Sequence, residues 1–295
     1  MRVNPNISND LLSALDIAKQ QEQTDLLQLA SGRRVNSPSD DPVAAAILVQ
    51  NHAQSSTDDQ YLRSVTSVQS ELQTTDSTLG SVVSTLDRAI SLGVQGSTGT
   101  LSDADRNALV GELQGIQSQL VSLANLSYQG QYLFAGTATT TPPYNADSSQ
   151  PSGVRYDGNG NTNEVAVGNG YNLQVNLPGS QLFSGSGTDM FQSMQDLISA
   201  LQSNSGVDTA TAAVRAAFDH ITAQRVFYGN AMNQLSSQQT YLNSDKLQLS
   251  TQEDAVGGAD MAATTTSLLN AENAQSAALA AAGRITQTSL FDYLK

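Results

Sequence analysis

LASGRRVNSPSDDPVAAA, residues 29–46, places the end of one helix, a turn and the start of another helix in immediate succession. Gly32 can supply the left-handed conformation that often closes a helix. Asn36-Ser37-Pro38 is a turn sequence. Asp41 precedes Pro42, so a carboxylate can cap the next helix while proline occupies its first position, where it loses no hydrogen bond. The stretch therefore predicts two helices joined by a short, defined connector.

Further segments carry apolar residues at steps of three and four, the spacing of helices that pack in near-parallel, coiled-coil fashion. We expect one helix from Pro42 to about residues 93–96, and another opened by Ser102-Asp103-Ala104-Asp105, which has the pattern of a capping box. Gly257-Gly258 ends the last long pattern, and an alanine-rich helix is expected over 260–294. The apolar positions are Val65, Val68, Leu72, Thr75, Leu79, Val82, Leu86 and Ala89; Leu109, Leu113, Ile116, Leu120 and Leu123; Phe191, Met194, Ile198 and Leu201; and Val214, Phe218, Ile221, Tyr228, Met232, Leu235, Leu242 and Leu249, with Arg225, Gln239 and Lys246 as polar interruptions.

Residues 137–188 have a different character. Turn signals such as Asn159-Gly160 and Gly168-Asn169-Gly170 surround segments 164–167 and 172–177, in which polar and apolar residues alternate as in half-buried strands. The predicted fold class is therefore mainly α with a small β insert, in which the N- and C-terminal segments form a long antiparallel helical bundle or coiled coil.

This organisation predicts three domains. They are residues 1–40 with 258–295 as a terminal helical coiled coil, residues 41–137 with 188–257 as a helical bundle, and residues 138–187 as the β-rich insert. Because the ends of the insert should lie close together, we expect the helical body to tolerate its removal.

Composition excludes several classes of function. The net charge is −14, and the 13 Lys and Arg residues are scattered, which argues against nucleic acid and against an anionic membrane surface. There are no cysteines, so disulfides and thiolate metal sites are absent. The longest late apolar run, residues 277–282, is far below the ~18 residues of a membrane span. The N-terminus lacks the pattern of a cleaved signal peptide, and taken alone the sequence predicts a cytosolic protein.

Two groups of side chains resemble ligand or catalytic sites. Residues 157–161, DGNGN, carry oxygens at alternate positions like a calcium loop, but Thr162 and Gly168 stand where that loop needs Gly and Glu. We interpret the Asp-Gly and Asn-Gly pairs as a hairpin turn. His52 and His220 fall outside the apolar positions of their helices, so we expect both on the surface.

Asp40-Asp41 is better explained by helix capping than by acid–base catalysis, because no motif supplies a partner that would orient a catalytic base. We therefore expect no enzyme, and no catalytic, cofactor-binding or metal-binding residue.

Three segments resemble the bacterial flagellin family. Residues 29–37, LASGRRVNS, are similar to the Leu-Ser-Ser-Gly-x-Arg-Ile-Asn-Ser connector of flagellins, and the continuation PSDDP at 38–42 resembles the hook-associated branch of the family more closely. Residues 128–136, YQGQYLFAG, resemble the end of the N-terminal helical region of that branch, and residues 289–294, SLFDYL, resemble its C-terminal tail. The resemblance implies a helical hairpin fold and a structural, extracellular role after export through the flagellar channel without a cleaved signal.

The two terminal segments carry apolar residues up to Leu294, although polar residues 20–25 interrupt the first segment. Solvated, frayed ends would not need such residues. Burying a leucine is worth about 1.5–3 kcal/mol, so packing against neighbouring subunits would order these segments. Arg33 and Arg34 either favour the dipole of the preceding helix or pair with an acidic neighbouring subunit. The predicted assembly interface comprises Ile7, Leu11, Leu15, Leu26, Leu29, Arg33, Arg34, Leu279, Ile285, Leu290 and Leu294.

The resemblance implies an adaptor that joins the flagellar hook to the filament. Its implied partners are hook-associated protein 1 on the hook side, flagellin on the filament side, copies of itself in a ring, and an export chaperone bound to its C-terminal region. One alternative is a flagellin filament subunit, which copy number per flagellum would distinguish. A second alternative is a secreted coiled-coil module whose β insert binds a ligand, which a binding screen of the insert would test.

Overall fold

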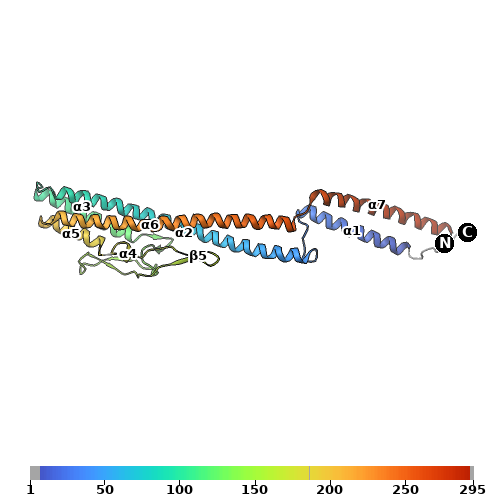
Figure 1. Ribbon diagram of the computed structural model, residues 1–295, viewed down its shortest axis with the longest axis horizontal. Coiled ribbons are helices and arrows are strands. Elements are labelled where there is room, and N and C mark those ends of the chain that lie inside the picture. Colours follow the sequence, from blue (N-terminus) through green and yellow to red (C-terminus); the bar gives the residue numbers. More distant parts are fainter. Residues whose placement is uncertain (1–6, 186, 293–295) are drawn as a thin grey trace. The chain divides into compact units, whose positions relative to one another are not determined.

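The computed structural model describes residues 7–185 and 187–292, which form long helices and one β-rich region (Figure 1). The helices are α1 (Ile7–Ser31), α2 (Pro42–Gly96), α3 (Asp103–Ala124), α4 (Gly179–Leu182), α5 (Met190–Ser203), α6 (Val207–Gly257) and α7 (Met261–Asp292). The strands are β1 (Ser127–Tyr128), β2 (Gln131–Tyr132), β3 (Tyr144–Ala146), β4 (Val154–Tyr156), β5 (Glu164–Gly168) and β6 (Tyr171–Gln174). The predicted mainly α fold with a small β insert is confirmed.

Contacts between residues group the chain into two compact units. Residues up to 57 and from 244 onward form the terminal unit, and residues 58–243 form the central unit. Helices α2 and α6 each contribute residues to both units. The expected division into three domains stays a prediction.

The core of the central unit follows the predicted apolar pattern. Every predicted position on α2 from Val65 to Ala89 is buried, and Leu72 on α2 and Leu235 on α6 are both 0% exposed. The capping box at the start of α3 is confirmed, because Ser102 Oγ accepts a hydrogen bond from the backbone N–H of Asp105 while the Asp105 carboxylate accepts one from the backbone N–H of Ser102. Long helices therefore form where narrow apolar faces can pack together.

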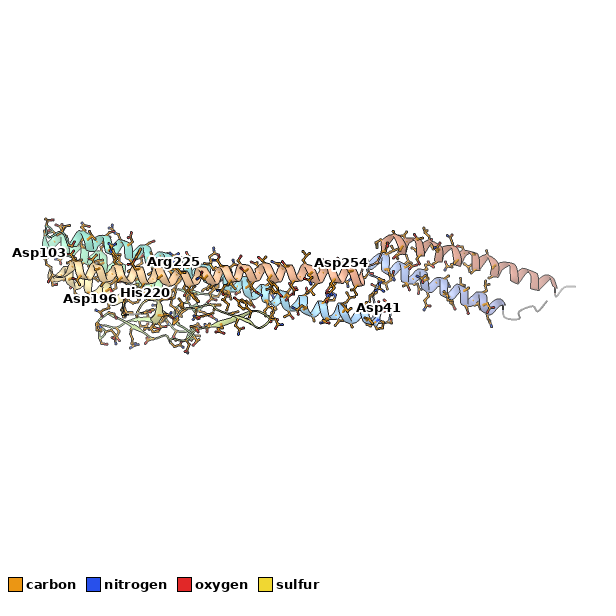
Figure 2. The ribbon with its side chains drawn as sticks, viewed as in Figure 1. Asp41, Asp103, Asp196, His220, Arg225 and Asp254 are labelled. Atoms are coloured by element: carbon orange, nitrogen blue, oxygen red, sulfur yellow. The ribbon has the colours of Figure 1, made fainter. Side chains whose placement is uncertain are left out.

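Arg225 interrupts the apolar pattern of α6 and is paired within the same unit. Figure 2 labels Arg225 on α6. Its Nε and Nη2 donate to the two carboxylate oxygens of Asp76 on α2, at 2.9 and 3.0 Å. A bidentate guanidinium–carboxylate pair fixes the geometry as well as the charge. The polar interruption thus links the two longest helices instead of breaking one of them.

The strands form three separate antiparallel hairpins. In the first, β1 and β2 are joined by Gln129 and Gly130, both with positive φ, the backbone that a two-residue hairpin turn of type I′ requires. The segment 128–136 is therefore a hairpin and the loop after it, because α3 ends before this segment at Ala124. The predicted strand at 164–167 is confirmed as β5, and β6 covers the first half of the predicted segment 172–177.

The loop at 157–161 is not a hairpin turn, contrary to our interpretation of its sequence. It connects β4 to β5, and these two strands pair with β3 and β6 instead of with each other. Asn159 Oδ1 accepts hydrogen bonds from the backbone N–H groups of Thr137 and Asn161, at 2.9 and 3.1 Å. The loop therefore ties the second hairpin region back to the chain that follows β2.

The β-rich region shares its core with the helices. Phe134, Tyr144, Phe183 and Phe191 form an aromatic cluster with ring centroids 5.0–6.3 Å apart, and it joins β3 to α5. Further apolar side chains of the insert are buried in the same core, namely Val167, Leu173, Val175 and Leu177. The expectation that the helical body tolerates removal of the insert does not fit this packing.

Candidate assembly interface

The connector between α1 and α2 is held by backbone hydrogen bonds to the end of α6. Gly32 ends α1 with φ of 68°, which confirms its predicted left-handed role. The N–H of Arg34 donates to the carbonyl of Gly257 at 2.7 Å, and the N–H of Ala259 donates to the carbonyl of Gly32 at 3.0 Å. Residues 32–34 and 257–259 therefore form a short antiparallel bridge. One side of the bridge follows α1, and the other side precedes α7.

Arg34 adds side-chain bonds to this bridge. Its Nη2 donates to the backbone carbonyl of Val256 at 2.9 Å and to Asp41 Oδ2 at 3.1 Å. The carbonyl belongs to the last turn of α6, where backbone acceptors lack partners within the helix. Arg34 therefore caps the C-terminal end of α6, which neither of our two interpretations of this arginine anticipated.

The carboxylates of the connector act as caps, as the sequence predicts. Asp41 Oδ1 accepts from the backbone N–H of Ala44 at 3.0 Å, and this bond together with the Arg34 guanidinium holds the pKa of Asp41 below its ordinary value. Hydrogen bonds from the hydroxyl and the N–H of Ser37, and from the N–H of Asn36, likewise lower the pKa of Asp40. Both carboxyls are ionised at neutral pH and stabilise the turn.

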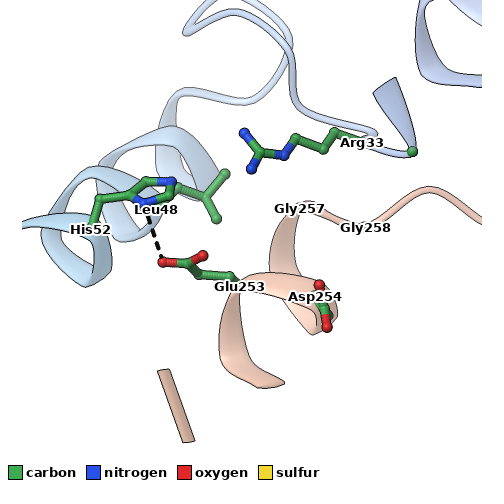
Figure 3. A pocket seen from close by; sticks show the side chains of 8 residues that line it. Arg33, Leu48, His52, Glu253, Asp254, Gly257 and Gly258 are labelled. Carbon is green, nitrogen blue, oxygen red and sulfur yellow. Dashed lines mark ion pairs between the residues drawn. The ribbon is translucent and has the colours of Figure 1, made fainter. Parts of the chain in front are cut away.

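A cavity of about 60 Å³ lies beside the bridge, between α2 and α6 (Figure 3). Leu48 and His52 line it from α2, while Glu253, Asp254 and Gly257 line it from α6. His52 Nδ1 lies 3.5 Å from a Glu253 oxygen, so the expected surface histidine has an acidic neighbour. The cavity is too small for an organic substrate, and among the described residues no group of three or more acidic or histidine side chains could hold a metal ion.

Arg33 also lines this cavity and is exposed, and in the described part of the chain its guanidinium has no ion-pair or hydrogen-bond partner. It differs in this respect from Arg34, which is committed to the connector. The two adjacent arginines therefore have different tasks, and only Arg33 is available to an acidic partner.

Helices α1 and α7 lie side by side in the terminal unit (Figure 1). The residues buried between them are small or polar, namely Ala18 and Asp25 on α1 and Thr264 and Ala271 on α7. The polar segment 20–25 does not interrupt α1, which is continuous from Ile7 to Ser31. The fully buried residues of the seam are therefore small or polar, while Leu11, Leu15 and Leu29 of α1 are half-buried.

The large apolar side chains of this helix pair are mostly on its outside. Leu26 is 49% exposed and Leu279 is 56% exposed. Isolated exposed leucines are common in proteins, but several on one helix pair favour a surface that becomes covered. The further exposed members of this set are Leu12, Ile17, Leu27, Met261 and Leu269.

The predicted interface residues fall into three groups. Leu11, Leu15 and Leu29 are half-buried, whereas Leu26, Leu279, Arg33 and Arg34 are exposed. Ile7, Ile285 and Leu290 lie on the described helices but their side chains lie outside the description, and Leu294 lies outside the described residues. Whether these residues contact neighbouring subunits stays a prediction.

Sequence reasoning missed two features, one in each unit of the chain. Asp25, taken as part of a polar interruption, is only 2% exposed. Its seam position one heptad after Ala18 was the available signal. His220 was expected on the surface, but it is half-buried and its Nε2 lies 2.9 Å from the carbonyl of Gln181, so it links α6 to α4.

In the described residues no helix is both long and apolar enough to cross a membrane.

Several known flagellar proteins are similar to this chain. The model of the bacterial flagellin N-terminal helical region matches residues 3–139. Flagellar hook-associated protein 3 of Escherichia coli is 29% identical over 299 residues, which covers 91% of this chain and 91% of that protein. The protein of the same name from Salmonella typhimurium is 34% identical over 161 residues, covering 53% of this chain and 48% of that protein. Flagellins match as well, at 27–30% identity.

The fold is also that of a solved flagellar protein. The crystal structure of the flagellar junction protein FlgL from Legionella pneumophila superposes with a TM-score of 0.62 at 17% identity, and the match covers 72% of this chain and 100% of that chain. At this identity the likeness establishes the flagellin-like fold alone.

Proposed function

We propose that this chain, which is similar to flagellar hook-associated protein 3 over nearly its whole length, is a structural subunit that joins the flagellar hook to the flagellin filament. The observation that carries the proposal within the molecule is the arrangement of α1 and α7. The fully buried residues of this helix pair are small or polar, whereas Leu26 and Leu279 are exposed. Covering such side chains releases about 1.5–3 kcal/mol for each leucine that becomes fully buried.

In this proposal the function is the assembly of subunits and involves no catalysed reaction. Subunits leave through the flagellar export channel and reach an extracellular position at the tip of the hook. There the α1–α7 pairs of neighbouring subunits cover one another's apolar faces, and a ring forms. Hook-associated protein 1 contacts the ring on the hook side and flagellin contacts it on the filament side. Before export, a chaperone covers the C-terminal region. Arg33 is the connector cation that can pair with an acidic surface of a neighbour.

A deletion strain tests the proposal. Loss of the gene should leave hooks without filaments while flagellin accumulates in the medium, and the wild-type gene should restore filaments. If the filament and flagellin secretion are lost together, the protein acts in export and the proposal is wrong. A flagellin filament subunit is the alternative that the flagellin matches favour. Counting copies per flagellum distinguishes the two, because a filament needs far more copies than a junction ring.

Point variants test the exposed face in the same strain. Replacing Leu26 and Leu279 together by Asn should abolish filament attachment but leave the melting of the purified subunit unchanged, because both side chains are exposed. The matched control is Val226→Asn at an exposed apolar position of α6 in the central unit, which should retain filaments. Removal of residues 283–295 should behave like the leucine variants. Filaments that form normally with Leu26 and Leu279 both replaced would exclude this face from the interface.

A further inference from the structure

The β-rich region contains the same tripeptide, Gly-Asn-Gly, in two different settings. The first is residues 158–160 and the second is residues 168–170, and together they hold both Asn-Gly pairs of the sequence. An asparagine side chain can be attacked by the backbone nitrogen of the residue that follows it. A glycine in that position favours the attack, because it has no Cβ to shield the nitrogen and its backbone reaches more conformations. The two tripeptides are equal in local chemistry, so only the fold can distinguish them.

The fold holds Asn159 through its backbone and its side chain. Its N–H donates to the carbonyl of Ala135 at 3.1 Å, and its carbonyl accepts from the hydroxyl of Tyr156 at 3.0 Å. Its Nδ2 donates to Thr137 Oγ1 at 2.8 Å, while its Oδ1 accepts from the N–H groups of Thr137 and Asn161, at 2.9 and 3.1 Å. The side-chain amide can approach the nitrogen of the following glycine only after these bonds break.

Asn169 has none of these restraints. It lies in the turn that joins β5 to β6, where both Asn169 and Gly170 are exposed. In the part of the chain that the structure describes, the Asn169 side chain makes no hydrogen bond. No atom lies within 4 Å of the place that a Cβ of Gly170 would take, so there is room around the attacking nitrogen.

We infer that Asn169 is a site of spontaneous deamidation and that the fold protects Asn159 from the same reaction. The Gly170 nitrogen forms a bond to Cγ of Asn169, the bond from Cγ to Nδ2 breaks, and ammonia leaves with the proton of the Gly170 N–H. Water then opens the resulting succinimide ring at one of its two carbonyl carbons, and the Gly170 nitrogen regains a proton. Opening at Cγ gives aspartate, and opening at the main-chain carbon gives isoaspartate. The inference goes beyond the proposed function and does not depend on it.

The modification changes a turn that is packed against α6. Both products add a negative charge to a chain whose net charge is already −14. Isoaspartate also lengthens the main chain by one carbon between Gly168 and Tyr171, which are paired across the turn. The Tyr171 hydroxyl donates to Gln234 Oε1 on α6 at 3.1 Å, and a Cβ at Gly168 would collide with the Gln238 side chain. The β5–β6 hairpin therefore has little freedom to absorb the extra atom.

Peptide mass analysis of the purified full-length protein tests the inference. The protein is incubated folded at mildly alkaline pH, which favours attack by the amide nitrogen, and is then cleaved after Tyr156, Glu164 and Tyr171. Peptides 157–164 and 165–171 each contain one Asn-Gly pair. Peptide 165–171 should gain the mass of deamidation at least about tenfold faster than peptide 157–164, because three side-chain hydrogen bonds hold Asn159. In urea the two peptides should react at similar rates.

A variant tests the consequence for the hairpin. Amide protection in residues 164–174 should fall during the incubation of the wild type and stay constant in Asn169→Gln, because the longer side chain closes a ring far more slowly. Enzymatic methylation of isoaspartate should label peptide 165–171 of the wild type alone.

Three results would overturn the inference. Equal rates for the two peptides in the folded protein would show that the fold does not distinguish the two asparagines. A peptide 165–171 that gains mass in urea but not in the folded protein would show that the turn protects Asn169. Unchanged amide protection in fully deamidated protein would show that the hairpin absorbs the modification.

Discussion

Two buried tyrosines of the central unit should respond in opposite directions when each loses its hydroxyl. Tyr144 lies in the aromatic cluster, and its hydroxyl is buried without a hydrogen-bond partner among the described residues. Tyr228 on α6 is equally buried, but its hydroxyl accepts a hydrogen bond from the backbone N–H of Leu177 at 3.3 Å. Burial raises the pKa of both phenols, so both are neutral near pH 7. The pair therefore isolates the effect of the hydrogen bond.

The magnitudes follow from the cost of a buried polar group without a partner, about 1–3 kcal/mol. Tyr144→Phe removes such a group and keeps the ring, so the free energy of unfolding should rise by up to that amount. Tyr228→Phe leaves the Leu177 N–H without its acceptor, so the free energy should fall by a similar amount. For a unit of residues 58–243, each kcal/mol shifts the melting temperature by about 2–4 °C.

Urea unfolding and calorimetric melting of the wild type and the two variants measure the difference. We expect Tyr144→Phe to melt above the wild type and Tyr228→Phe below it, with unchanged urea m-values. If Tyr144→Phe is destabilised as much as Tyr228→Phe, the Tyr144 hydroxyl has a partner such as a bound water, and the reasoning is refuted.

The remaining predictions concern the core, the bridge, acid and the insert. Leu72→Ala should cost about 2–5 kcal/mol because the side chain is fully buried, whereas Leu247→Ala at a 70% exposed position should leave urea unfolding unchanged. A Cβ at Gly258 would collide with the carbonyl of Asp254, so Gly258→Ala should lower amide protection in residues 32–41. The folded state lowers the pKa of the Asp41 carboxyl. The stability that this carboxylate contributes is therefore complete above about pH 4 and is lost as the pH falls through the folded-state pKa. An NMR titration of the connector measures this loss. Replacing residues 139–181 by a short linker should cause loss of helical circular dichroism or aggregation, because it strips apolar side chains from the shared core.

Each of these predictions has an outcome that would contradict it. An equal effect of Leu72→Ala and Leu247→Ala would mean that the helix packing is wrong. Unchanged protection in Gly258→Ala would show that the bridge tolerates a shift of the backbone. A connector that keeps its order after the Asp41 carboxyl has been protonated would remove the role of the Asp41 cap. Helices that stay folded and monomeric without residues 139–181 would restore the insert as a separate unit.

The features that the sequence predicted correctly depend on residues close together in the chain. The positive φ of Gly32, the Asp41 cap and the capping box at Ser102 each involve neighbours within a few positions. The apolar spacing of α2 is likewise local, and the alternation of polar and apolar residues predicted the strand at 164–168. Local chemistry decides such elements almost regardless of their surroundings.

The failures come from partners that are distant in the chain. Arg34 caps a carbonyl at Val256, 222 residues away, and no local pattern reveals it. Asp25 was interpreted as part of a break because polar residues in a helix suggest exposure, yet α7 covers it and the helix continues. The turn signals in the insert suggested that it is a separate domain, although Tyr144 of the insert packs on Phe191 of α5. Tertiary packing overrides the local signal in each case.

The bridge between residues 32–34 and 257–259 also has a consequence for the order of folding. Its two sides are separated by 222 of the 295 residues, and closing a loop of that length costs about 5 kcal/mol of chain entropy. During synthesis the ribosome makes residues 32–34 long before residues 257–259. Gly32 and Arg34 therefore lack their hydrogen-bond partners until the intervening residues have been synthesised. Helices α2 and α6, once paired in the central unit, shorten the effective loop to a few turns. The bridge should therefore be the last tertiary contact to form and the first to break. Its presence then indicates that the residues between its two sides have folded.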